Sequence, residues 1–188
     1  MKNYSKSVQN GWAFYDWANS VYSLVISTAI FPIYYFAVIG GDENTLVQFM
    51  GMDIKGSALL SYTISISFMS IALLSPYLSA LADYTGNKKK FMRIFVMIGS
   101  LSCMSLYFFT EEYFWVGIVA SYFASIGFSG SLVFYNAYLP EIAPIKDQDA
   151  LSAKGFAIGY FGSSLLLIIN LAMILNHESL GFENEDLL

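Results

Sequence analysis

The chain has 188 residues, of which only 12% are charged while 56% are hydrophobic. Soluble domains carry about 25% charged residues, so this composition argues against an ordinary soluble globule, and its hydrophobicity excludes a disordered chain. The net charge of −5 argues against a nucleic-acid partner, because nucleic acids are bound by basic surfaces. One histidine, His177, cannot build a histidine-based metal site alone. The remaining class is an integral membrane protein, with the lipid bilayer as its surroundings.

Five nearly uncharged segments are long enough to cross a bilayer, which requires about 20 apolar residues. They cover residues 11–39, 57–82, 91–110, 113–139 and 155–175. The predicted fold class is therefore all-α and integral to the membrane. The first segment is interpreted as a retained helix, because its apolar run exceeds the roughly 7–15 residues of a signal peptide and contains Asp16.

Basic residues predict the orientation of these spans. Eight of the nine lysines and arginines lie in the N-terminal tail or near the loops after the second and fourth spans, and only Lys55 lies on the opposite side. The positive-inside rule then places the N-terminus in the cytoplasm, and the expected location is the cell (inner) membrane. An odd number of spans suggests a fragment, although a natural five-span protein is also possible.

One face of the first span is polar. When the segment is projected as a helix at 100° per residue, five polar side chains fall within about 40° of one line along its surface. They are Asp16, Ser20, Ser23, Ser27 and Tyr34, and Asn19 lies beside them. These side chains either line an aqueous cavity or form hydrogen bonds between helices. Asp16 either has a coupling role or forms a structural ion pair with Arg93 or Lys154. Pro32 in this span and Pro76 in the second can mark kinks.

Later spans add further candidates. Gly155, Gly159 and Gly162 share one side of the fifth span, where small residues favour close helix packing. Asn136 near the cytoplasmic end of the fourth span and Asn170 deep in the fifth need polar partners in lipid. Both asparagines are therefore candidates for the substrate cavity, with packing between helices as the alternative.

The loop after the second span contains an Asp-x-x-Gly-x-Lys-Lys pattern, formed by Asp83, Gly86, Lys88 and Lys89. Taken alone, the pattern predicts a tight turn with cytoplasmic positive charge. In this position it resembles the major facilitator superfamily signature, roughly Gly-x-Leu-Ala-Asp-x-x-Gly-Arg-Lys/Arg-Lys/Arg. Ser79 replaces the first glycine of that signature, and Asn87 replaces its usual arginine.

Two further stretches resemble the vacuole-effluxer branch of that superfamily. One reads Trp-Ala-Phe-Tyr-Asp-Trp-Ala-Asn-Ser-Val-Tyr over residues 12–22, followed by Phe31-Pro32. The other reads Phe-Tyr-Asn-Ala-Tyr-Leu-Pro-Glu-Ile over residues 134–142, followed by glycines at 155, 159 and 162. The resemblance implies a twelve-helix transporter of two six-helix halves that works by alternating access. This chain would supply helices 1 to 5, so the missing C-terminal half is an expected partner.

The resemblance also implies roles for individual residues. Helices 1, 4 and 5 would help line the central cavity, and the loop with Asp83 and Lys88 would form the cytoplasmic gate. The function expected is a secondary transporter that exports amino acids or similar small polar metabolites. The alternative is a non-transporting membrane fragment or an assembly subunit that needs a partner half.

Enzymatic activity is not expected from this sequence. It contains no nucleotide-binding Gly-x-x-x-x-Gly-Lys-Ser/Thr loop. It also lacks an intramembrane pair of carboxylates, a nucleophile with its base and a His-Glu-x-x-His metal motif. No cofactor or metal is predicted, and the only ligand expected is the small-molecule substrate.

Overall fold

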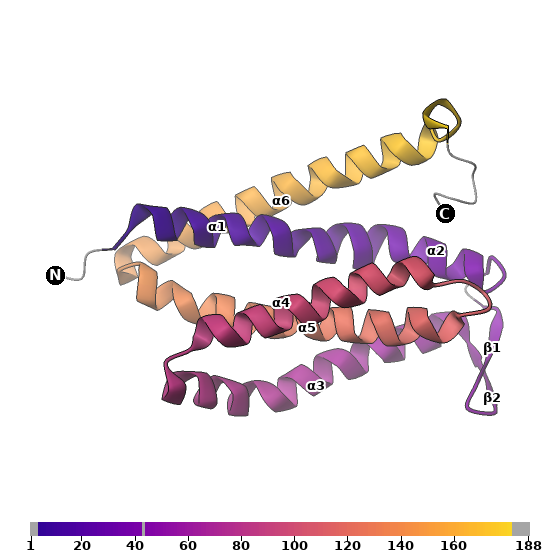
Figure 1. The fold of residues 1–188 in the computed structure, drawn as a ribbon, viewed down its shortest axis with the longest axis horizontal. Coiled ribbons are helices and arrows are strands. Elements are labelled where there is room, and N and C mark those ends of the chain that lie inside the picture. Colours follow the sequence, from indigo (N-terminus) through magenta and orange to yellow (C-terminus); the bar gives the residue numbers. More distant parts are fainter. Residues whose placement is uncertain (1–3, 43, 182–188) are drawn as a thin grey trace. The chain divides into compact units, whose positions relative to one another are not determined.

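The computed structural model describes residues 4–42 and 44–181 (Figure 1). Within these residues five helices are long and apolar enough to cross a membrane, at Lys6–Val38, Gly56–Thr85, Lys88–Phe108, Phe114–Ile142 and Ile145–Leu175. The predicted all-α membrane class is confirmed. The fifth helix begins at Ile145 rather than near residue 155, because its first turns are exposed and charged and need no bilayer around them.

The first span is a composite helix. It consists of α1 (Lys6–Val21), a π-helical segment η1 (Tyr22–Ile30) and α2 (Phe31–Val38). A π-helix bonds residue i to i+5 and is rare beyond a single turn inside an α-helix. Pro32 lies two residues after the end of η1, and a proline cannot supply the amide hydrogen that an α-helix would use there.

The remaining elements follow in chain order. They are the strands β1 (Leu46–Phe49) and β2 (Met52–Lys55), the helices α3 (Gly56–Thr85), α4 (Lys88–Ser105), α5 (Phe114–Ile142) and α6 (Ile145–Leu175), and the 3₁₀ turns η2 (Leu106–Phe108) and η3 (Glu178–Leu180). The contacts divide the chain into two compact units. The first unit combines Met1–Tyr34 with Pro140–Leu188, and the second unit is Tyr35–Leu139.

In the first unit α1 packs against α6, a contact that can be followed in Figure 1. The helices approach closely because a Cβ at Gly162 would collide with the indole ring of Trp17. That ring also meets Phe161 edge-on, with the ring centroids 6.4 Å apart. Near the start of α1, the side-chain amide of Gln9 donates a hydrogen bond of 2.9 Å to the carbonyl of Ile142.

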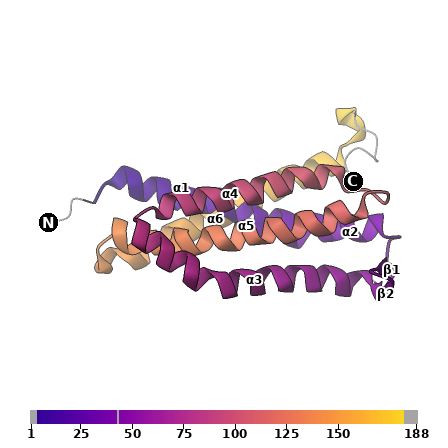
Figure 2. The ribbon, with the colours of Figure 1, turned by 60° about the horizontal axis from the view of Figure 1, so that its bottom comes forward.

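In the second unit α4 and α5 lie side by side, as Figures 1 and 2 both show. A Cβ placed on Gly127 would collide with the backbone of Gly99, so only glycine permits this separation. The same contact continues through stacked rings, with the centroids of Phe95 and Phe134 5.9 Å apart and those of Phe91 and Phe134 5.5 Å apart. Close packing along these glycines and rings holds the two helices together.

A β-hairpin, which is not among the elements predicted from the sequence, joins the first two spans. Its two-residue turn is Met50-Gly51, with φ angles of 49° and 82°, as a type I′ turn requires. The register pairs Val47 with Ile54 and Phe49 with Met52. The ring of Phe49 lies 5.1 Å from that of Trp115 at the start of α5. The alternating apolar residues around Gly51 are the signal that indicates this hairpin.

Candidate functional site

Asp16 is the central polar residue of the first unit. It lies in α1 and is only 5% exposed. A Cβ on Gly159 of α6 would lie 2.9 Å from the Asp16 Oδ2 atom and 2.6 Å from the Ser20 Oγ atom. Asp16 and Ser20 share one helix face because they are four residues apart. Glycine at position 159 therefore leaves the space that these two side chains occupy.

No basic side chain pairs with Asp16 inside the described part of the first unit. Lys154, one of the two predicted partners, instead donates a hydrogen bond of 2.6 Å to the Oδ1 atom of Asn10. Arg93, the other predicted partner, belongs to the second unit. A carboxylate in a membrane span is costly and is retained for function more often than for stability, which makes Asp16 the strongest candidate site residue.

Three serine side chains, Ser20, Ser23 and Ser27, follow Asp16 along the first span. Across residues 4–42 and 44–181, the side chains of Ser20, Ser23 and Ser27 form no hydrogen bond. Other hydroxyls in the bundle return to their own helix, as Thr63 does to the carbonyl of Leu59 at 2.8 Å. Free hydroxyls in a membrane span need water, another helix or a ligand.

The π-helical segment changes how the polar face continues. Each residue of η1 turns the chain less than an α-helical residue does, so the projection at 100° per residue holds only as far as Val21. Tyr34 is half-buried, whereas Tyr35 is fully buried and donates a hydrogen bond of 3.1 Å to the carbonyl of Gly56 in the second unit. Tyr35 is not among the predicted site residues, because the change of helix type is not visible in the sequence.

The three asparagine candidates lie on different helices. Asn19 is half-buried on α1, and Asn170 is half-buried on α6 of the same unit. Asn136 is exposed on α5 and belongs to the second unit. Among the predicted site residues, the structure therefore brings Asp16 and Ser20 into contact with Gly159. Gly155, Gly159 and Gly162 are all buried on α6.

The loop motif ends one helix and begins the next. Gly86 has a φ of 65°, and its amide donates to the carbonyls of Ala82 and Asp83, which terminates α3. The Lys88 Nζ atom lies 3.0 Å from the Asp83 Oδ1 atom. The neighbouring Lys89 is exposed. Asn87, which replaces the arginine of the superfamily signature, donates from its side chain to the carbonyl of Thr85 at 3.0 Å.

The substitution Asp83→Asn should change the free energy of unfolding by less than about 1 kcal/mol, because exposed ion pairs contribute little. The Asp83 side chain is 63% exposed, so water replaces Lys88 readily. Chemical denaturation of the wild-type and variant proteins in detergent checks this expectation. A decrease of several kcal/mol in the free energy of unfolding would show that Asp83 has a buried partner elsewhere in the intact protein.

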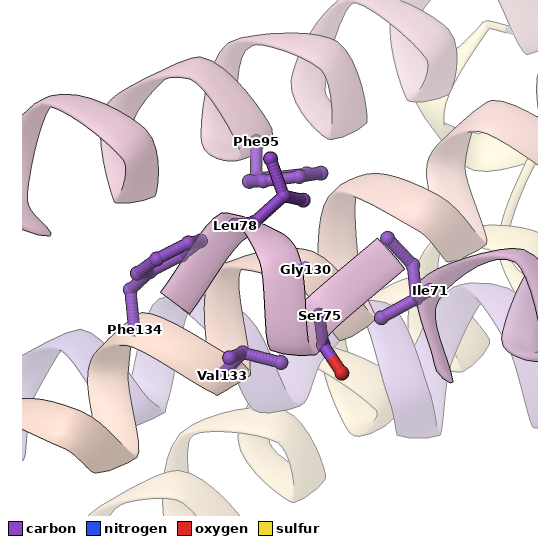
Figure 3. Close-up of a pocket in the computed structure, with 7 residues that line it drawn as sticks. All are labelled: Ile71, Ser75, Leu78, Phe95, Gly130, Val133 and Phe134. Carbon is purple, nitrogen blue, oxygen red and sulfur yellow. The ribbon is translucent and has the colours of Figure 1, made fainter. Parts of the chain in front are cut away.

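An apolar groove in the second unit is a packing seam (Figure 3). It is lined by Ile71, Ser75, Leu78, Phe95, Gly130, Val133 and Phe134. The groove offers no space that a water molecule could occupy, and a Cβ on Gly130 would collide with the ring of Phe95. Among residues 4–42 and 44–181, no cluster of histidine, cysteine or carboxylate side chains could hold a metal ion.

Comparison with known proteins identifies relatives of this chain. Residues 4–187 match the family described as vacuole effluxer Atg22 like. The chain is 42% identical over 176 residues to the uncharacterized MFS-type transporter YxiO of Bacillus subtilis (strain 168), an alignment that covers 93% of this chain and 39% of YxiO. It is also similar to autophagy-related protein 22 of two fungi. The identity is 33% for Pyricularia oryzae, covering 54% of this chain and 15% of the relative, and 33% for Gibberella zeae, covering 66% and 19%.

No solved structure matches the chain significantly. The chain spans well under half the length of the relatives it matches. Five helices able to cross a membrane, with a buried carboxylate in the first, define a multi-pass membrane protein. Because the family match covers nearly all of its residues, the chain belongs to the vacuole effluxer Atg22-like family. The resemblance inferred from the three sequence motifs is thereby confirmed.

Proposed function

We propose that this chain forms the N-terminal part of a secondary transporter that exports amino acids or similar small polar metabolites by alternating access. The names of the relatives support transport, since YxiO is described as an MFS-type transporter and the family as vacuole effluxers. The observation that carries the proposal is Asp16, a buried carboxylate in a membrane span that has no basic partner in the described part of its own unit. The protein would lie in the cell (inner) membrane with its N-terminus in the cytoplasm.

The polar face of the first span would line the substrate cavity in this proposal. Its members are Asp16, Asn19, Ser20, Ser23, Ser27 and Tyr34, joined by Asn136 and Asn170 from the fourth and fifth spans. The unpaired hydroxyls of the three serines support this role, because they can bond to water or to a polar substrate. The helix end with Asp83, Gly86, Lys88 and Lys89 would act at the cytoplasmic gate, and a C-terminal half would complete the cavity.

Counterflow into proteoliposomes tests this function. Proteoliposomes that contain the intact protein, encoded by the full reading frame, are loaded with one unlabelled amino acid at a time. Uptake of the same amino acid in labelled form is then measured for each of the twenty. Saturable exchange is expected for at least one amino acid. An alternating-access transporter can reorient across the membrane with substrate bound, so it exchanges unlabelled molecules inside for labelled molecules outside. Residues 1–188 alone should give no exchange above empty vesicles, since they would lack half of the cavity.

Two results would contradict parts of the proposal. Absence of exchange by the intact protein for all twenty amino acids would refute the amino-acid assignment. Specific exchange by residues 1–188 alone would show that no partner half is needed. A reading frame that ends at Leu188 would instead direct the search to a separate partner subunit.

A further inference from the structure

The helix α4 has two faces of different character. Phe91, Phe95 and Gly99 lie within about 80° of one another at 100° per residue. This face packs against α5, where both rings stack on that of Phe134 and Gly99 meets Gly127, and Figure 2 shows the two helices side by side. On another side of α4, four apolar side chains share an arc of about 80° and are 44–69% exposed. This apolar stripe consists of Ile94, Met97, Leu101 and Met104.

The apolar stripe suits contact with lipid. Among the five spans of the described residues, Lys88–Phe108 has the smallest buried share, 6% against 17–50% for the other four. Exposure of such a stripe to water would be unfavourable. Lipid tails are as apolar as leucine, so the same exposure inside a bilayer carries no such cost.

Two basic residues continue the apolar stripe toward the start of α4. Lys90 and Arg93 are exposed, and together with the stripe they lie within about 100° of the helix surface. In the described part of the chain, the side chains of Lys90 and Arg93 form no ion pair and no hydrogen bond. Lys88, by contrast, lies 3.0 Å from Asp83. Since α4 contains no carboxylate, its own helix does not neutralise these two charges.

The cationic groups of Lys90 and Arg93 can reach a single phosphate. Residues three apart on a helix have Cβ atoms about 5–6 Å apart, and both side chains tilt toward the N-terminal, charged end of α4. Long basic side chains extend from an apolar helix surface to the level of the lipid headgroups. The amide of Lys90 already donates to the carbonyl of Asn87 at 2.9 Å, so the side chains are the groups that are available to a ligand.

Lysine and arginine donate strong charge-assisted hydrogen bonds to phosphate oxygens. We infer that Lys90 and Arg93 bind the headgroup phosphate of an anionic phospholipid, whose acyl chains lie along the apolar stripe. A headgroup with a net negative charge is favoured, because the ammonium group of phosphatidylethanolamine neutralises its own phosphate and is repelled by two cations. This lipid site goes beyond the transport function proposed above and does not depend on it.

A tryptophan on the apolar stripe reports which lipid occupies it. Met97 lies about 10 Å along the helix from Lys90, and phospholipids brominated midway along their acyl chains quench a tryptophan that they touch. The intact protein with Met97→Trp is placed in phosphatidylcholine nanodiscs that contain brominated phosphatidylglycerol or brominated phosphatidylethanolamine, and the quenching of the parent protein is subtracted. Brominated phosphatidylglycerol should quench at a mole fraction roughly tenfold lower, because each basic residue near an anionic lipid favours its binding severalfold.

Charge variants test the two basic residues. In the Met97→Trp protein, Lys90→Gln with Arg93→Gln should remove most of the preference for phosphatidylglycerol. Lys90→Arg with Arg93→Lys keeps both charges and should retain the preference. The matched control is Lys6→Gln with Lys146→Gln, which removes two exposed lysines of the first unit and should leave the preference unchanged.

Three results would overturn the inference. Equal quenching by the two brominated lipids in the Met97→Trp protein would show that the stripe does not select an anionic lipid. Absence of quenching by either lipid would show that protein covers the stripe, either the C-terminal half or a second copy of the chain. A preference that persists after Lys90→Gln with Arg93→Gln would assign it to other residues.

A salt titration decides the case in which the double glutamine variant does not fold. Raising the salt concentration from about 0.1 M to about 1 M shortens the Debye length from about 10 Å to about 3 Å. The preference of the Met97→Trp protein for phosphatidylglycerol should then fall severalfold, because it depends on charge. A preference that does not change with salt overturns the inference.

Discussion

Gly127→Ala should destabilise the protein by about 2 kcal/mol, although only one methyl group is added. The new Cβ would collide with the backbone of Gly99, which cannot move aside as a flexible side chain could. Overpacking of this kind costs about 3 kcal/mol, and the better helix propensity of alanine offsets about 1 kcal/mol of that cost. Denaturation of the intact protein in detergent measures the difference.

Gly11→Ala is the matched control for this prediction. No atom lies within 4 Å of a Cβ placed on Gly11, which is exposed in α1. At this position no collision opposes the better helix propensity of alanine, so the same substitution should stabilise the protein by about 0.5–1 kcal/mol. The two substitutions should therefore change the free energy of unfolding in opposite directions. A Gly127→Ala variant as stable as the wild type would show that α4 and α5 are not in close contact.

Asp16→Asn should lower transport by the intact protein at least tenfold without lowering its stability. The asparagine side chain has nearly the same shape as aspartate, so it fits the space beside Gly159 and Ser20. The substitution also removes a charge that is costly in a membrane span. Loss of activity together with unchanged or higher stability is characteristic of residues retained for function. Flux in proteoliposomes and denaturation in detergent measure the two effects.

The control for this variant is Asp149→Asn. Asp149 is exposed near the start of α6, so the same change of charge should affect neither flux nor stability. If Asp16→Asn transports as well as the wild type, the carboxylate has no role in the cycle. If it instead unfolds easily, Asp16 has a structural partner in the complete protein, such as the predicted ion pair.

Features of the sequence that depend on composition and local spacing predicted the structure well. The five helices follow from long apolar runs, which the bilayer requires. The turn at Gly86 follows from a glycine directly before a charged segment, and its φ of 65° agrees. The family follows from motifs distributed from residue 12 to residue 162, and the match over residues 4–187 confirms it.

Features that depend on hydrogen bonding or on distant contacts were not predictable. The π-helical segment depends on which carbonyl each amide chooses, and the α- and π-helical choices differ by one residue along the same apolar sequence. It alters the face on which Tyr34 and Tyr35 lie. The hairpin at Met50-Gly51 is a different case, because alternating apolar residues around Gly51 do indicate it, but its four-residue strands are short and are not among the predicted elements.

The sequence by itself determined the membrane class, the number of spans and the family, because apolar length and motif spacing are local properties of the chain. Only the tertiary structure decided which small residues face a neighbour. Gly127 meets Gly99 across two consecutive helices, and Gly159 meets Asp16 across two helices that are far apart in sequence. Such contacts depend on how two helix surfaces fit together, and that fit is a property of the pair of helices rather than of either helix alone.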